Sequence, residues 1–337
     1  MHQCNKLFQY NYGNNGLWIS LQSSNLESLL KKATELENKY EWLKAAEVYE
    51  KAFDLKTKNN EPKNSAELYN KKGFCFFKAA FQAESNYQFT RIMKLAIQSY
   101  EKAILFFKEI KNVDRIVSIN NTLAKISYAK SWIEPNPSKK TIFIAEWWTL
   151  KSKVLDTYEK MGDQLHFGKI CNDMLQNSYD SYYWIGRNSG ELEEKRNKLI
   201  SLGEKAITIL SELNENHELA RAYCWTSLFY LKDNLMELGS TEKEIKKGLI
   251  YSKKALKLSK KLGDAYLIGW SFHSTSHAAN IQNDYDAQID FLNLSLQKGE
   301  IIKDNYLSGL AQFQMVSWNF INAMKIEDPD VVRQIHK

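Results

Sequence analysis

The chain has 337 residues, of which 44% are apolar, and its formal net charge is +6. This apolar share suits a soluble protein with an extended core. The charge is mild for the length and indicates an anionic partner only where the excess is concentrated. No stretch approaches the roughly 18 uninterrupted apolar residues of a membrane-spanning helix, so none is expected.

The first residues and the cysteines of the sequence indicate where the protein is located in the cell. The first residues lack the basic and then apolar layout of a secretion signal. No CxxC pair occurs, and the four cysteines lie far apart at Cys4, Cys75, Cys171 and Cys224. This spacing predicts reduced thiols that serve mostly in packing. We therefore expect a cytoplasmic protein.

The chain is predicted to begin with an irregular or disordered segment, residues 1–24, which contains the run "NYGNNG". From residue 25 apolar residues recur at helical spacing, with Ser24 or Asn25 as a plausible cap. A break at Lys39–Tyr40 follows, and a second apolar stripe runs from Trp42 to Phe53. The whole chain contains only four prolines, which favours long helices.

A short phrase returns along the chain. It reads "EKAF" at Glu50 and "EKAI" at Glu101, and its steps measure 51, 51, 52, 49 and 40 residues; the later copies begin at Ser152, Glu204, Lys253 and Asn293. A second marker follows about a dozen residues later, as in "KMGD" and "KLGD". Two markers with a constant offset indicate an internal repeat.

Each repeat reads as two helices. The first helices are predicted near Ala66–Phe81, Arg115–Trp132, Gln164–Trp184, Leu219–Leu238, Tyr266–Ile281 and Tyr306–Met324. Turns with Asp, and "EPNPS" at Glu134–Ser138, separate them. No stretch alternates apolar and polar residues, so no sheet is expected. The predicted fold is all-α, a right-handed α-solenoid of antiparallel helix hairpins with about six to seven units of 40–52 residues. Its domain covers residues 25–337 and is open to continuation past Lys337.

The segment "YEWLKAAEVYEKAFDL" (Tyr40–Leu55) resembles the second half of a tetratricopeptide repeat, with Ala45 and Ala52 at its two small positions. The segment "NDYDAQIDFLNLSLQKG" (Asn283–Gly299) resembles the same half, with Ser295 in place of the second alanine. Because the unit is nearer 50 residues than the usual 34 or so, the chain looks like the long-helix relatives of that family, such as the soluble NSF attachment proteins. The resemblance implies a concave groove, lined by the first helix of each hairpin, that binds a peptide or another protein.

Several polar residues of the first helices are candidates for contacts in this groove. Asn70 and Asn121 each lie three residues before a small packing residue, where the carboxylate-clamp version of the family makes contacts, although no second basic residue completes a clamp. His273 and His277 share one helix face, which fits groove lining, hydrogen bonding between helices or, with a third ligand, a metal. The full candidate set is Asn70, Asn121, Lys125, Arg221, Trp225, His273 and His277.

The stretch from residue 242 to 264 is unusually rich in lysine. At 100° per residue its eight lysines fall within an arc of roughly 140°, and they are Lys243, Lys246, Lys247, Lys253, Lys254, Lys257, Lys260 and Lys261. The opposite face is predicted to hold Ile245, Leu249, Tyr251, Ala255, Leu258 and Leu262. The lysines suit a solvated outer face, whose stems cover apolar surface. They also suit a docking strip for an acidic protein, a nucleic-acid backbone or anionic lipid.

Two aromatic clusters, one at Trp147 and Trp148 and one in "SYDSYYW" (Ser178–Trp184), are predicted to pack between repeats. We find no phosphate-binding glycine loop, no nucleophile elbow and no Cys/His metal cluster, so we predict a protein that is not an enzyme and has no cofactor. The predicted function is a scaffold for a protein or peptide partner, with nucleic acid unlikely. The alternative is a sensory module that controls an effector.

Overall fold

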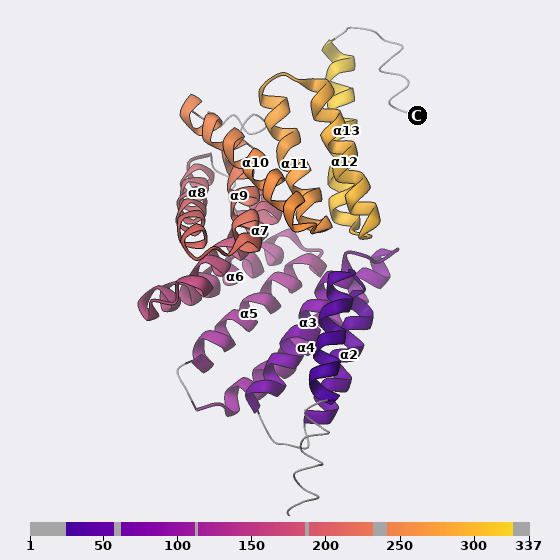
Figure 1. Cartoon of the computed structure of the whole chain (residues 1–337), viewed down its shortest axis with the longest axis vertical. Helices are drawn as coiled ribbons and strands as arrows, with labels where there is room; N and C mark the ends of the chain where they lie inside the picture. Colours follow the sequence, from indigo (N-terminus) through magenta and orange to yellow (C-terminus); the bar gives the residue numbers. More distant parts are fainter. Residues whose placement is uncertain (1–24, 57–61, 112–113, 186–188, 232–240, 326–337) are drawn as a thin grey trace, which may run out of the picture. The chain divides into compact units, whose positions relative to one another are not determined.

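The computed structural model describes residues 25–56, 62–111, 114–185, 189–231 and 241–325, and every regular element in these ranges is an α-helix (Figure 1). The predicted fold class is confirmed within each compact part of the chain, where successive helices pack as antiparallel hairpins in the manner of a solenoid. None of the described helices is long and apolar enough to cross a membrane. The predicted irregular segment, residues 1–24, lies outside the described residues.

The chain divides into two compact units, residues 1–133 and 134–337, and the boundary in the sequence falls at the start of the "EPNPS" stretch. Unit 1 contains a helix over residues 25–38, followed by α2 (Trp42–Lys56), α3 (Pro62–Ala80), α4 (Asn86–Glu109) and α5 (Asp114–Ile133). Unit 2 contains α6 (Pro137–Met161), α7 (Gln164–Ile185), α8 (Ser189–Glu212), α9 (Asn216–Leu231), α10 (Glu242–Leu262), α11 (Ala265–Ile281), α12 (Tyr285–Ile301) and α13 (Asn305–Lys325).

The helices of unit 2 pack in chain order, and α9 also contacts α7 and α11. These three are first helices of successive hairpins, so they form a continuous row. Trp147, Trp225 and Trp270 are buried in this unit, and Trp148 packs against its main core with part of its ring exposed. Of the predicted second aromatic cluster, Tyr179 is buried in the same core. The side chains of residues 180–184 lie outside the described ones.

The second sequence marker corresponds to a turn in which a residue in the left-handed conformation ends one helix and an acidic residue comes just before the next. The marker turns have their left-handed residue at Gly162, Asn214 and Gly263, and the same turn recurs at Tyr40, Asn283 and Lys303. After Gly263, whose φ is 72°, the side chain of Asp264 caps α11 by accepting a hydrogen bond from the amide of Leu267 at 3.0 Å. Glycine adopts this φ without strain, and Asp satisfies amides that have no partner inside the helix.

Small residues bring the helices of a hairpin close together. At Gly73 of α3 an added Cβ would lie 2.6 Å from ring carbons of Tyr100 in α4, so only glycine fits there without a shift.

Helix α10 is buried along a stripe of small residues, Gly248, Ser252, Ala255 and Ser259. This differs from the predicted apolar face, of which only Ala255 is buried. The reason is the close approach of α9, whose Tyr230 and Leu231 side chains lie where a Cβ on Gly248 would be.

Candidate functional site

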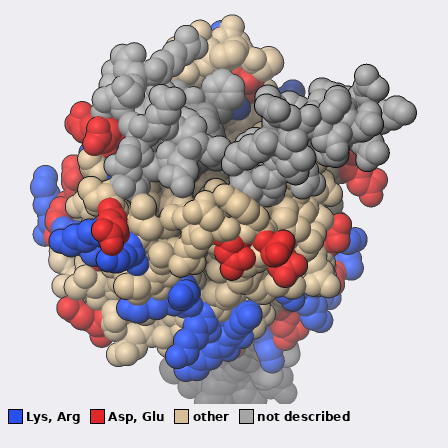
Figure 2. Space-filling view, turned by 90° about the horizontal axis from the view of Figure 1, so that it is seen from above, with Lys and Arg blue, Asp and Glu red and all other residues tan. Residues whose placement is uncertain are grey.

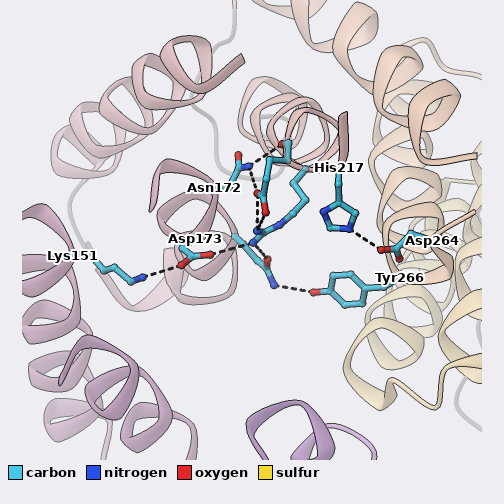
Figure 3. A network of polar contacts seen from close by, with 9 residues as sticks. Lys151, Asn172, Asp173, His217, Asp264 and Tyr266 are labelled. Atoms are coloured by element: carbon cyan, nitrogen blue, oxygen red, sulfur yellow. Dashed lines mark hydrogen bonds and ion pairs between the residues drawn. The ribbon is translucent and has the colours of Figure 1, made fainter. Parts of the chain in front are cut away.

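A network of polar side chains connects α6, α7, α9 and α11 in unit 2 (Figure 3). Its nine members are Lys151, Asn172, Asp173, Gln176, His217, Glu218, Arg221, Asp264 and Tyr266. We call the described surface of α7, α9 and α11 that carries this network the first-helix face of unit 2. Most of its contacts join residues 45 to 48 positions apart, which is close to the repeat length.

Arg221 on α9 is the centre of the network. Its guanidinium donates to Glu218 of the same helix at 2.9 Å and to Asp173 and Gln176 of α7 at 3.2 and 3.0 Å. Only 17% of the Arg221 side chain is exposed. Burial alone would lower the pKa of this guanidinium, but the carboxylates of Glu218 and Asp173 outweigh burial and raise it. Arg221 therefore stays charged and fixes α9 against α7.

Two further contacts complete the charge balance. Lys151 of α6, whose side chain is 1% exposed, donates to Asp173 at 2.9 Å. The buried amide of Asn172 donates to both the carboxylate and the backbone carbonyl of Glu218, each at 2.8 Å. The two cations Lys151 and Arg221 thus face the two carboxylates Asp173 and Glu218, and these four charges at the centre of the network balance.

The network extends to α11 through two further contacts. The amide of Gln176 donates to the hydroxyl of Tyr266 at 2.8 Å. His217 of α9 contacts Asp264, the cap of α11, at 2.9 Å between Nε2 and Oδ2. Successive first helices are therefore held in one register by side-chain contacts as well as by packing.

The predicted groove residues of α9 and α11 are enclosed by neighbouring helices. Trp225 is fully buried, and its ring centroid lies 4.6 Å from that of Trp270. His273, also fully buried, bonds the hydroxyl of Tyr179 at 3.0 Å. The ring of His277, which is 7% exposed, bonds the amide of Gln314 in α13 at 3.0 Å. As contacts to a partner these residues stay predictions, because in the structure they join helices to one another.

In unit 1 the structure brings two of the predicted residues together. Lys125 of α5 donates to the side-chain oxygen of Asn70 in α3 at 2.9 Å, and its ammonium lies 5.6 Å from the centre of the Tyr100 ring. The nitrogen of the same amide lies 3.5 Å from the hydroxyl of Thr122. Asn121, the neighbour of Thr122, is half-buried. The half-buried amide of Asn70 is therefore oriented by a cation.

A second polar cluster of unit 2 connects α8, α9 and α10. Glu204 of α8 accepts hydrogen bonds from the hydroxyls of Tyr230 and Tyr251 at 2.7 and 2.9 Å and from Lys247 at 3.1 Å. Burial alone would raise the pKa of Glu204, but these three donors outweigh it and hold the pKa below its ordinary value of 4.5. The ionised carboxylate of Glu204 thus connects α8 to α9 and α10 through hydrogen bonds.

The predicted lysines of α10 lie outside the core. Seven of the eight are exposed and Lys247 is half-buried. Figure 2 shows that on one face of the molecule lysine and arginine side chains gather in groups. The cysteines that the structure describes are free and buried, at Cys75, Cys171 and Cys224. Burial raises the pKa of the Cys171 and Cys224 thiols to about 12.

Sequence reasoning identified Arg221 but missed its partners Asp173, Gln176 and Glu218. It also missed Lys151, which pairs with Asp173. The available signal was the spacing, since Asp173 and Arg221 stand 48 residues apart, close to the step of 52 residues between these two repeats. Over the described ranges, no three His, Cys, Asp or Glu residues gather as a metal site.

No protein-family model and no curated protein matches the chain. Among solved structures, the crystal structure of a Rap protein complexed with competence and sporulation factor contains a similar chain. The identity is 13%, the match covers 93% of this chain and 85% of that one, and the TM-score is 0.49. The all-helical hairpin fold is seen directly in this chain, whereas the tetratricopeptide resemblance stays a prediction.

Proposed function

We propose that this chain is a helical-repeat binding module that holds an extended peptide, or an extended segment of a partner protein, along the first helices of its hairpins. The observation that carries the proposal is the network on the first-helix face of unit 2. It fixes α7, α9 and α11 in one register, so a bound segment would meet polar groups whose positions are already set. Such pre-organisation lowers the entropy cost of binding.

The charge balance of the network favours a neutral ligand group. Lys151 and Arg221 are each held by a carboxylate, so little net charge remains to attract an ion. The half-buried amide of Gln176 bonds Tyr266 and Arg221 through one N–H and one lone pair, so its second N–H and second lone pair can serve a ligand. In unit 1 the amide of Asn70 has the same capacity beyond its contacts to Thr122 and Lys125. A peptide backbone presents the complementary pair of neutral groups at every residue.

Half-buried aromatic rings supply the apolar part of the surface. On first helices, Tyr266 of α11 and Tyr306 of α13 pack against the main core of unit 2 while part of each ring remains exposed. Large, rigid aromatic rings often dominate the binding energy of interfaces. A segment with apolar side chains between backbone contacts would therefore suit this face. A sensory module would use the same face, so one experiment tests the step that both functions share.

The test is selection of a phage-displayed library of random peptides on the purified chain, followed by fluorescence anisotropy with the selected peptides. The variant Gln176→Met keeps the shape of the side chain and removes its amide. We expect it to weaken binding about tenfold, which equals about 1.4 kcal/mol for a lost polar contact.

The matched control is Gln297→Met on the exposed surface of α12. It makes the same chemical change away from the first helices and should leave binding unchanged. Thermal unfolding of both variants checks that unit 2 remains folded. The proposal is refuted if no peptide is selected, or if the selected peptides bind both variants as tightly as they bind the wild type.

A further inference from the structure

Helix α10 carries a dense positive surface that the proposed function does not use. Its eight lysines define the lysine face, Lys243, Lys246, Lys247, Lys253, Lys254, Lys257, Lys260 and Lys261. The face runs for about 27 Å at a rise of 1.5 Å per residue and spans an arc of roughly 140°. The centre of this arc lies opposite the stripe of small residues that α10 buries. The lysine face is therefore the outward side of the helix.

The charge of the lysine face is mostly uncompensated. Lys246 pairs with Glu242 at 2.7 Å, and Lys247 pairs with Glu204 at 3.1 Å. The other six lysines form no ion pair with any residue that the structure describes. Two of them, Lys254 and Lys260, instead place the ammonium group 5.2 Å from the centre of a neighbouring aromatic ring. Like charges at such spacing repel one another, and a bound anionic partner would reduce this repulsion.

An exposed apolar residue lies in the middle of the lysine face. Ile250 is 51% exposed. At 100° per residue it falls between one row of lysines near Lys246, Lys253 and Lys257 and another near Lys247 and Lys254. The face thus offers an apolar centre with cations on both sides.

We propose that the lysine face of α10 docks an acidic helical segment of a partner protein. Such a helix lies lengthwise on α10, with an apolar residue against Ile250 and rows of Asp or Glu against the two rows of lysines. The length and the narrow width of the face fit one helix of about five turns. Paired charges on either side of an apolar seam are also how coiled-coil helices choose their partners.

The second helices of the neighbouring hairpins, α8 and α12, carry negative charge, which disfavours binding of α10 to a flat anionic surface. Exposed positions of α12 carry Asp286 and Asp290, and exposed positions of α8 carry Glu193 and Glu212. A membrane broad enough to cover the outward sides of several helices would also meet these carboxylates. Base readout and single-strand binding depend on arginine forks and stacking rings. Helix α10 contains no arginine, and its only aromatic residue, Tyr251, lies outside the arc of lysines.

The test measures binding of three fluorescent probes to the full chain. They are a synthetic acidic helix with glutamates on both sides of a leucine stripe, a double-stranded RNA of similar length, and vesicles that contain phosphatidylserine. The triple variant K253E/K257E/K261E reverses three exposed lysines. We expect it to weaken binding of the acidic helix at least thirtyfold, roughly the loss of three exposed ion pairs and their replacement by repulsion.

The matched control is K139E/K153E/K160E, which reverses three exposed lysines on one side of α6 in the same unit. It should weaken binding less than about threefold, as a long-range effect of net charge. A second pair tests the apolar centre. Ile250→Ser should weaken binding of the acidic helix about fivefold, whereas Ile142→Ser, at a residue 65% exposed on α6, should not.

Each other outcome overturns the proposal. Equal losses for the two lysine variants would mean that only net charge matters. Tighter binding of RNA or vesicles than of the acidic helix, lost in the K253E/K257E/K261E variant, would assign the face to that other partner. If no probe binds, the lysines serve as a solvated surface alone.

Discussion

Replacement of Arg221 by methionine tests whether the polar network fixes the first helices of unit 2. The change keeps most of the apolar stem and removes the guanidinium, with its bonds to Glu218, Asp173 and Gln176. Asp173 is 35% exposed and keeps its bond to Lys151, so its charge remains compensated. The main cost falls on Glu218, which is 14% exposed and keeps only the amide of Asn172.

Removal of one partner from a fully buried ion pair costs about 3–5 kcal/mol. Because both carboxylates keep a partner and are partly exposed, we expect about 2–3 kcal/mol for Arg221→Met, below the buried range. The double variant E218Q/R221M removes the uncompensated carboxylate as well. It should recover about half of this loss.

Hydrogen exchange followed by mass spectrometry is the suitable assay, because a repeat protein need not unfold in a single step. Protection of amides in α7 and α9 should fall about 30- to 150-fold, which corresponds to the expected free energy. Unit 1 serves as the internal control and should keep its protection. A loss below about 0.5 kcal/mol, the level of an ordinary surface substitution, would refute the reasoning. Equal loss in both units, or no recovery in the double variant, would do the same.

Three further predictions concern stability. Gly73→Ala forces a methyl group against the ring of Tyr100, so calorimetry should show a loss of about 1–3 kcal/mol; an unchanged melting temperature would contradict this. Glu204→Gln should cost about 1–2 kcal/mol near neutral pH. Because the folded pKa of Glu204 lies below 4.5, this contribution is present above the unfolded value and is lost as the pH falls through the folded one. The free energies of unfolding of the two proteins, measured by urea titration, should therefore become equal in acid. A difference that stays constant with pH would contradict the prediction. Asp264→Ala removes the cap on the Leu267 amide and should cost about 1 kcal/mol, seen as faster exchange in the first turn of α11 but not of α12.

The sequence predicts the helices well because each turn has a local signal. The expected helix at Tyr266–Ile281 begins one residue later than the observed α11, since the αL residue Gly263 and the cap Asp264 define its start. The expected helix at Leu219–Leu238 overlaps α9, whose described part ends at Leu231. Turn chemistry depends on a few neighbouring residues, so one sequence suffices to read it.

The site is harder to predict because it depends on the register between helices. Asp173 and Glu218 look like ordinary helix surface in isolation, and only the packing of α7 against α9 brings them to Arg221. The sequence predicts His273 and His277 on the groove side without knowledge of this register. Helix α11 is buried on nearly all sides, and the two histidines bond Tyr179 and Gln314 of other helices, so their contact with a partner stays a prediction.

The cations of the first-helix face are paired within the protein, whereas most of those of the lysine face have no ion pair with the residues that the structure describes. This difference should appear in how binding depends on salt. On the first-helix face the cations Lys151 and Arg221 are paired within the protein, so binding of a neutral backbone should change little with ionic strength. On the lysine face six cations lack a pair among the described residues, so binding of an acidic helix should weaken steeply as salt is added. Anisotropy titrations of both ligands at several salt concentrations would separate the two modes. Equal salt dependence would mean that both ligands use one surface, and K253E/K257E/K261E would then weaken both.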